Sequence, residues 1–262
     1  MNDLIIVLPG LLGIAFIFSI FGRGGGEFLL PFLITVLPLP FFDLASISLF
    51  LIFVQGAAML LVYGAKHKLV DWPLAFSLAA VVGVFAFFGG YLSIRIKPVY
   101  LKGTFAIFLL ISAYFIGKGK KVPAQAGRFG TWHRKMPDEE YDLNFLYILP
   151  PVGIIAFVAG MIGISGCGLI TPICILVGGV PIRVAMGTNT MLVLTSSGTS
   201  FIGHALRGGP PWELALIFSC AIVLGALVGS RVHINIPEKY IRTGFVTILI
   251  IAAVWMMVKI YL

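Results

Sequence analysis

Residues 22–37 read GRGGGEFLLPFLITVL, and residues 163–178 read GISGCGLITPICILVG. Both stretches place a glycine cluster before an apolar run that contains a proline, and they lie about 140 residues apart. Glycine interrupts helices because its backbone adopts conformations that other residues avoid. The two stretches therefore predict two broken helical segments at equivalent places in two halves of the chain.

The composition indicates that these segments lie in a lipid bilayer. Hydrophobic residues make up 60% of the 262-residue chain and charged residues 11%, whereas a globular domain carries about 25% charged residues. The mean hydropathy is +1.08. A soluble protein of this length has too little interior to cover so much apolar surface. At roughly 20 residues per span, about eight passages occupy most of the chain and leave no room for a large soluble domain.

Charge and cysteine content argue against several other classes of protein. The net charge is +8, but the basic residues cluster between apolar runs, as the positive-inside rule describes. They do not interleave with aromatic residues, so we expect no nucleic-acid partner. Cys167, Cys174 and Cys220 form no C-x-x-C motif, and we expect neither a disulfide framework nor a metal site. The sequence indicates no cofactor.

The repetition extends beyond the glycine clusters. Pro31 matches Pro172 at the same offset, and residues 90–98 match residues 229–237 in the spacing of the glycine that begins each stretch and the proline that ends it. The alternative explanation of this similarity is chance, because membrane proteins in general are rich in Leu, Gly and Pro. Chance explains a single match better than an ordered series of matches.

Three parts of the chain follow from this repetition. They are a first transmembrane repeat (1–117), a polar linker (118–143) and a second transmembrane repeat (144–262). The linker is predicted to be a surface loop with a short interfacial helix around Trp132.

Each glycine cluster leads into a short helix, Phe28–Leu37 or Leu169–Val177. About ten residues of helix extend roughly 15 Å, which is half of a hydrocarbon core of about 30 Å. We therefore expect each short helix and the segment before it to form a re-entrant hairpin with its tip near the bilayer midplane. Three transmembrane helices follow in each half, and this odd number inverts one half relative to the other. The predicted fold class is an all-α integral membrane protein with two inverted repeats.

The placement of basic residues predicts the orientation. With this topology, twelve basic residues fall on one side of the bilayer and five on the other. Cytoplasmic loops carry the excess of Lys and Arg. We expect a multi-pass protein of the cell membrane, with the central linker in the cytoplasm and both termini outside.

The glycine clusters are the strongest candidates for a binding site. Transporters use the N-termini of broken helices, with their free N–H groups and positive dipole ends, to bind anionic substrates. Gly24, Gly25 and Gly26 lead into one short helix, and Ser165, Gly166 and Cys167 lead into the other. Inversion of the halves brings these tips together. The alternative is that the glycines only permit close packing of helices.

Arg23 and Glu27 add charge to the first tip. An arginine at membrane depth costs about 2.5–3.5 kcal/mol on insertion scales and is by default a functional residue. The planar guanidinium of Arg23 suits a sulfite, sulfonate or carboxylate, although an interfacial arginine is the alternative. Glu27 either pairs with Arg23 at the helix N-terminus or carries a proton that couples transport to a gradient.

Polar residues in the following spans are candidates for shaping the site. Ser48 in the first half, and Thr188 and Asn189 in the second, follow the two re-entrant units. Their hydroxyl and amide groups either replace the hydration of a substrate or tie helices together. Cys167 lies at the second tip, in the place of Gly26, and serves either as a polarizable contact or simply as a small apolar residue.

An enzymatic alternative rests on Ser165 and His204. The string Gly163-Ile-Ser165-Gly166 resembles the serine motif of rhomboid intramembrane proteases, and His204 lies on a later span. Hydrolysis requires the histidine within hydrogen-bond reach of the serine and an oxyanion hole beside it. The repeat partner of the string carries no serine, so the shared feature of the two stretches is the glycine break.

The motifs GRGGGEFLLPFL and GISGCGLITPICILVGGVPIRVAMGTNT, in two halves around a polar loop, resemble the TauE/SafE sulfite exporter family. The resemblance covers nearly the whole chain. It implies the export of sulfite or a small organosulfur anion without ATP hydrolysis. Arg23, Glu27 and Cys167 depart from the small residues that the family leads us to expect, and these departures concern the substrate.

The function we expect is secondary transport of a small anion by alternating access around a single site between the two tips. No Walker motif G-x-x-x-x-G-K-[ST] occurs, which argues against direct coupling to ATP. A passive anion channel is the alternative within transport, and the intramembrane hydrolase is the alternative from another class. The expected partners are the anion and the lipid bilayer, and a homodimer is compatible with the composition.

Overall fold

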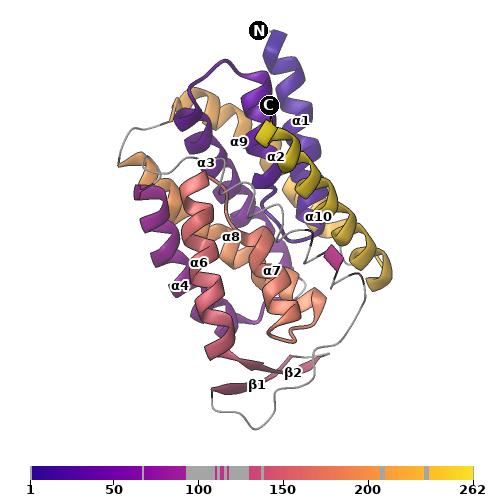
Figure 1. Ribbon diagram of the computed structural model, residues 1–262. Coiled ribbons are helices and arrows are strands. Elements are labelled where there is room, and N and C mark those ends of the chain that lie inside the picture. The colour runs from indigo at the N-terminus through magenta and orange to yellow at the C-terminus, as the bar shows by residue number, and fades with distance from the viewer. Residues whose placement is uncertain are drawn as a thin grey trace.

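A computed structural model describes residues 2–66, 68–92, 110, 113, 114, 117, 130–136, 139–206, 210–232 and 236–261. It is mostly helical (Figure 1). The first half contains α1 (Asn2–Ile20), α2 (Gly26–Val36), α3 (Phe41–Leu60), its π-helical extension η1 (Leu61–Lys66) and α4 (Trp72–Leu92). The linker carries β1 (Thr131–Lys135) and β2 (Glu140–Asn144), and the second half contains α6 (Phe145–Ile162), α7 (Cys167–Leu176), α8 (Ile182–Ala205), α9 (Trp212–Val232) and α10 (Glu238–Tyr261).

Four of the described helices are long and apolar enough to cross a bilayer. They span Phe41–Ala65, Trp72–Leu92, Phe145–Ile162 and Trp212–Val232, with mean hydropathies of 2.0–2.2. These helices confirm the prediction of a membrane protein with several spans. The end of the first predicted repeat, residues 93–117, lies outside the described residues except for 110, 113, 114 and 117.

The first broken segment is a hairpin of helices. The aromatic rings of Phe18 and Phe28 lie 5.2 Å apart next to the glycine break, and Gly10 in the middle of α1 contacts the ring of Phe32, further along α2. The two helices are therefore antiparallel. Figure 1 places the N-terminus and the connection from α2 to α3 at the same, upper end of the molecule.

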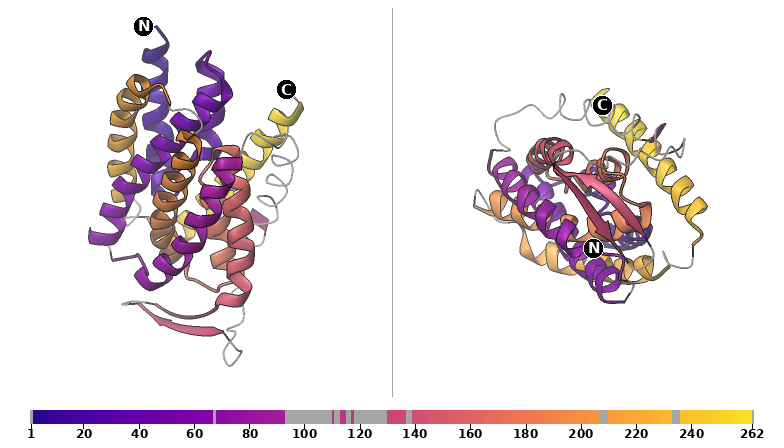
Figure 2. Two further views of the ribbon diagram at one scale, coloured as in Figure 1. Left: turned by 90° about the vertical axis from the view of Figure 1, so that its left-hand side faces the viewer. Right: turned by 90° about the horizontal axis from the view of Figure 1, so that it is seen from below.

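The second broken segment is a hairpin that enters from the other end. Ala159 contacts Gly166 at the break, whereas Ile148 near the start of α6 contacts Gly178 after the end of α7. A Cβ on Gly179 would lie 3.6 Å from the carbonyl oxygen of Asp142 in β2. This hairpin therefore opens toward the two strands, at the lower end of the molecule in both Figure 1 and the left view of Figure 2.

Contacts between the halves recur with the partners exchanged. Gly229 of α9 packs against the carbonyl of Phe16 in α1, and Gly89 of α4 packs against the carbonyl of Phe157 in α6. At the breaks, Gly22 packs against the backbone of Met186 in α8. The reciprocal contact joins Gly163 and Ala45 of α3. In each case a side chain larger than hydrogen would overlap its neighbour, so glycine permits the close approach.

The linker corrects one prediction. Trp132 lies in strand β1 rather than in an interfacial helix, and β1 pairs with β2 in an antiparallel hairpin with Thr131 opposite Asn144 and Lys135 opposite Glu140. Cross-strand ion pairs support this register, with 2.9 Å between Lys135 Nζ and Glu140 Oε1. Such opposite-charge pairs stabilise a sheet, and the protein is consequently not all-α.

Candidate functional site

The backbone at the two breaks has the same conformation. Gly22 and Gly25 have φ angles of 61° and 63°, and Gly163 and Gly166 have φ angles of 86° and 64°. Side chains other than hydrogen disfavour this left-handed region, which explains the glycines at these four positions. Gly25 and Gly166 directly precede α2 and α7 as their N-caps, and neither helix start has a side-chain cap.

Each break ends in the start of a short helix, as the sequence predicted. The carbonyl of Gly25 accepts hydrogen bonds from the N–H groups of Phe28 and Leu29 at 2.9 Å, and the carbonyl of Gly166 accepts from Leu169 and Ile170 at 2.9 and 3.3 Å. The first N–H groups of a helix have no partner within it. Two helix N-termini with positive dipole ends thus occur at matching positions.

The two tips contact one another. A Cβ on Gly24 would lie 3.4 Å from Ser165 Oγ, and a Cβ on Gly26 would lie 3.4 Å from Ile164 Cα. A Cβ on Gly168, in the first turn of α7, would overlap both Arg23 and Glu27. The structure therefore brings together the residues that the sequence placed at the two tips.

Arg23 is buried between these tips. Its Nη2 donates to Glu27 Oε1 at 2.6 Å, and the two side chains are 1% and 5% exposed. The guanidinium lies 5.3 Å from the centre of the Phe245 ring, which adds a cation–π contact. Nε and Nη1 of Arg23 have no hydrogen-bond partner among the described residues. A buried donor without a partner is costly, so these two nitrogens retain an unused capacity to donate hydrogen bonds.

Side chains of α3 and α8 hold the first tip in place. Asn189 Nδ2 donates to the carbonyl of Gly22 at 2.8 Å, and Gln55 Nε2 donates to the carbonyl of Arg23 at 3.3 Å and to Ser19 Oγ at 2.9 Å. Asn189 Oδ1, Gln55 Oε1 and Ser48 Oγ are buried without a partner among the described residues.

The two remaining predicted residues, Thr188 and Cys167, lie on different helices. The Thr188 hydroxyl accepts a hydrogen bond from the backbone N–H of Asp71 at 3.0 Å, on the side of the β-hairpin. Cys167 begins α7, but its side chain lies outside the described residues.

The structure places His204 in another environment. His204 Nε2 lies 3.3 Å from the carbonyl oxygen of Gly160, and the imidazole stacks on Phe42 with ring centres 5.1 Å apart. The carbonyl of Ser165 accepts a hydrogen bond from Ser196 Oγ. Nε2 thus faces a backbone carbonyl, and Nδ1 is buried without a hydrogen-bond partner among the described residues.

Sequence reasoning missed Gly168 and Asp71. Gly168 occupies the position of the second half that matches Glu27, and this correspondence was its only signal. Asp71 stands between two apolar spans, where a lone acidic residue reads as a helix cap. Among the described residues, no group of three or more His, Cys, Asp and Glu residues lies close enough to hold a metal ion.

Comparison with known proteins relates the chain to a family of membrane transporters. The sequence profile of the family described as "Sulfite exporter TauE/SafE" matches residues 6–256. The chain is 29% identical over 253 residues to "Probable membrane transporter protein YunE" of Bacillus subtilis (strain 168), covering 91% of this chain and 90% of the relative. It is 33% identical over 88 residues to "Probable membrane transporter protein" of Xylella fastidiosa (strain Temecula1 / ATCC 700964), covering 33% and 34% of the two chains.

No solved structure matches the chain. The family profile covers almost the whole sequence, and the similarity to a membrane transporter extends along nine tenths of both chains. The chain therefore belongs to the TauE/SafE sulfite exporter family, whose members are membrane transporters.

Proposed function

We propose that the protein exports a small anion, either sulfite or a small organosulfur or sulfonate anion, by alternating access around the two tips. The single observation that carries this proposal is the buried Arg23, next to two helix N-termini, whose Nε and Nη1 have no hydrogen-bond partner within the part of the chain that the structure describes. In a low-dielectric site an anion gains from both the guanidinium charge and the helix dipoles.

The proposed site consists of the tips and the polar side chains beside them. Arg23 and the N–H groups that follow Gly24, Gly25 and Gly26 bind the anion from the first half. The backbone N–H groups around Ser165, Gly166 and Cys167 bind the anion from the second half. The polar groups of Ser48, Thr188 and Asn189 shape the cavity that opens around it.

Alternating access requires two halves that can rock against each other, and we propose inverted repeats at residues 1–117 and 144–262 around the linker 118–143. A two-fold relation makes each contact recur with its partners exchanged. The reciprocal pairs Gly22–Met186 and Gly163–Ala45 support this relation. The opposite entry of the two hairpins in Figure 1 supports the inversion.

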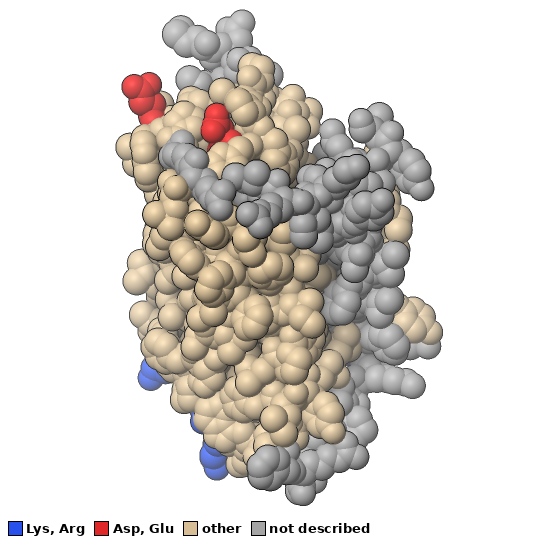
Figure 3. All heavy atoms as spheres, turned by 60° about the vertical axis from the view of Figure 1, so that its left-hand side comes forward, with Lys and Arg blue, Asp and Glu red and all other residues tan. Residues whose placement is uncertain are grey.

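The proposed orientation places the β-hairpin in the cytoplasm and the termini outside. Figure 3 shows Lys and Arg on the lower part of this face of the molecule and Asp and Glu at its upper end. The same lower end carries Arg134 and Lys135 of β1. Excess positive charge marks cytoplasmic loops, which supports this orientation.

Glu27 is the proposed coupling group. Its carboxylate already accepts a hydrogen bond from Arg23, with 2.6 Å between Arg23 Nη2 and Glu27 Oε1. An entering anion therefore competes with Glu27 for the same cation. Protonation of Glu27 would remove this competition and would tie anion binding to the uptake of one proton.

A flux assay in proteoliposomes tests the proposal. Sulfite, sulfoacetate and methanesulfonate are loaded inside, and efflux is compared for wild type, Arg23→Ala and Ser165→Ala. We expect Arg23→Ala to lose flux at least tenfold and Ser165→Ala to retain it. Equal flux in wild type and Arg23→Ala would contradict the anion site. Peptide cleavage that requires Ser165 and His204 would instead establish the hydrolase.

A further inference from the structure

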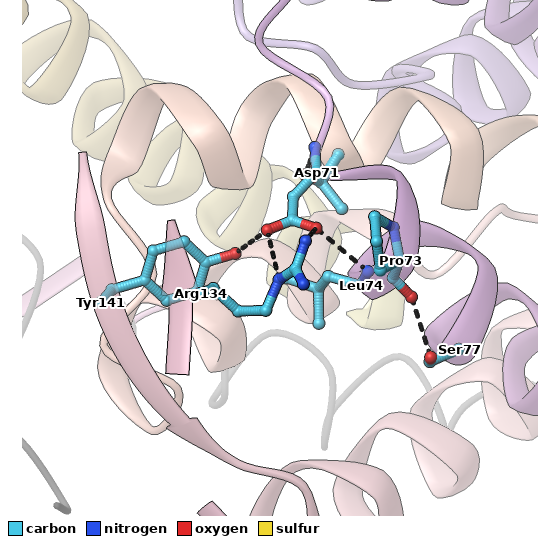
Figure 4. Close-up of polar contacts among 7 residues, drawn as sticks. Asp71, Pro73, Leu74, Ser77, Arg134 and Tyr141 are labelled. Atoms are coloured by element: carbon cyan, nitrogen blue, oxygen red, sulfur yellow. Dashed lines mark hydrogen bonds and ion pairs between the residues drawn. The ribbon is translucent and has the colours of Figure 1, made fainter. Parts of the chain in front are cut away.

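Asp71 is the centre of a buried polar cluster at the β-hairpin end of the molecule. It directly precedes α4 and is fully buried. Arg134 of β1 binds both of its carboxylate oxygens, Nε to Oδ2 at 3.0 Å and Nη2 to Oδ1 at 2.8 Å. Tyr141 of β2 donates to Oδ2 at 2.7 Å, and the N–H of Leu74 donates to Oδ1 at 3.2 Å (Figure 4). These contacts join the first half of the chain to the linker.

The strands hold Arg134 and Tyr141 firmly in this cluster. The Arg134 guanidinium lies 4.4 Å from the centre of the Trp132 ring, and its hydrogen bonds with Asp71 raise the pKa of Arg134. Burial, followed by the hydrogen bond to Asp71, raises the pKa of Tyr141. Both groups therefore keep the protonation state that the cluster needs at neutral pH.

The cluster also reaches the first tip. The backbone N–H of Asp71 donates to Thr188 Oγ1 at 3.0 Å, and the next residue, Asn189, donates to the carbonyl of Gly22 at 2.8 Å. The loop before Asp71 packs on the same stretch of α8, because a Cβ on Gly187 would lie 2.5 Å from the carbonyl oxygen of Leu69. A short series of contacts thus connects the β-hairpin to the proposed anion site.

Helix η1, which precedes this loop, contacts the first tip by a second route. The hydroxyl of Tyr63, in η1, lies 2.9 Å from the carbonyl oxygens of both Ser19 and Ile20 at the end of α1. Lys68, further along the loop, has a φ of 52°, which is unusual for a residue other than glycine. Helix η1 is thus bound to the tip, and the described loop residues 68–71 are bound to α8 and to the β-hairpin.

We propose that Asp71, Arg134 and Tyr141 form a latch that holds the β-hairpin end closed, and that Asp71 positions the first tip through Thr188 and Asn189. The inference rests on the proposed alternating access, in which this end must open to release or admit the anion. A buried carboxylate that loses its cation is strongly disfavoured until water reaches it. Separation of Arg134 from Asp71 and entry of water at this end therefore occur together.

Cysteine labelling tests the latch without any substrate. Cys174→Ala and Cys220→Ala leave Cys167, the first residue of α7, as the reporter. The probe is a membrane-impermeant cationic methanethiosulfonate, applied to proteoliposomes from the β-hairpin side or from the other side. We expect Arg134→Gln to label at least tenfold faster than wild type from the β-hairpin side.

Two further variants make the result specific to the latch. Lys135→Gln breaks the neighbouring exposed ion pair with Glu140 on the same strand and should leave the labelling rate unchanged. Arg134→Lys keeps the charge but loses the two-point contact, so it should label at an intermediate rate. Its labelling rate from the opposite side should stay as in wild type, which a general loss of folding would not produce.

The outcomes separate the latch from the transport proposal. Equal labelling of wild type, Arg134→Lys and Arg134→Gln, or labelling of none of them, would overturn the latch even when anion efflux is normal. Faster labelling of Arg134→Gln together with no anion efflux by wild type supports the opening of this end and overturns the proposed substrate instead.

Discussion

The carboxylate of Glu27 lies directly against the backbone of Gly168, across the junction between the two broken helices. The two residues occupy matching positions in the two halves, 141 residues apart. The charged side chain of one half thus fits only because the other half carries glycine at the same place. This asymmetry leaves one Arg23–Glu27 pair for the two tips.

Gly168→Ala should lower anion flux at least tenfold. The added methyl group would overlap Glu27 and Arg23, and it must displace the ion pair because the backbone of α7 is fixed. Alanine favours helices more than glycine does, so the helix itself is not weakened. Efflux from proteoliposomes measures the effect. Gly13→Ala is the control, because its methyl group would meet no atom within 4 Å. Similar losses in both variants would contradict the prediction.

Glu27→Gln should bind the anion more tightly and release it more slowly. Removal of the negative charge leaves Arg23 without its competing carboxylate, so KM for efflux should fall about tenfold, which corresponds to about 1.4 kcal/mol. The maximal rate should fall as well, because a more tightly bound anion leaves more slowly. Initial efflux rates over a range of anion concentrations measure both constants. Glu213→Gln, exposed at the start of α9, is the matched control. An unchanged KM would show that Glu27 and the anion do not share Arg23.

Local residue chemistry explains why the breaks could be predicted. Left-handed backbone at Gly22, Gly25, Gly163 and Gly166 requires glycine, so the pattern of glycines is directly visible in the sequence. The contact of Glu27 with Gly168 joins two halves of the chain, and no local pattern encodes it. The β-hairpin was not predicted, because its stability depends on side-chain pairs between strands, which no single stretch of sequence shows. One such pair joins His133 Nδ1 and Asp142 Oδ1 at 2.6 Å.

Asn189→Ala should destabilise the protein and impair transport together. Asn189 Nδ2 of α8 donates a hydrogen bond to the Gly22 carbonyl at 2.8 Å. Loss of this side chain leaves the carbonyl without that hydrogen bond in an apolar interior. Such bonds between membrane helices contribute about 1 kcal/mol, so we expect a thermal midpoint lower by a few degrees in detergent. Flux should also fall, because the first tip is no longer held. Thr199→Ala, which removes a hydroxyl bonded within α8 itself, should change neither. A stable Asn189→Ala protein with full flux would contradict the role of this bond.

The contribution of Tyr141 to stability should depend on pH in one direction. Burial and the hydrogen bond to Asp71 raise the pKa of Tyr141 in the folded protein, whereas an unfolded tyrosine has a pKa of about 10. A raised pKa contributes stability that is complete below the unfolded value and is lost as the pH rises through the folded one. Asp71, Arg134 and Cys174 are the charged and titratable groups that act on this phenol.

The difference in thermal midpoint between wild type and Tyr141→Phe isolates this effect from other groups that titrate in alkali. The difference should stay constant from pH 6 to 9, because the phenol is neutral in both states over this range. The difference in thermal midpoint should shrink above about pH 10, because loss of the phenol proton stabilises the unfolded wild-type chain there. Tyr147→Phe, at an exposed position of α6, should show no such change. A difference that grows with pH would mean that Tyr141 is bound as a phenolate, and the hydrogen bond to Asp71 would then be wrong.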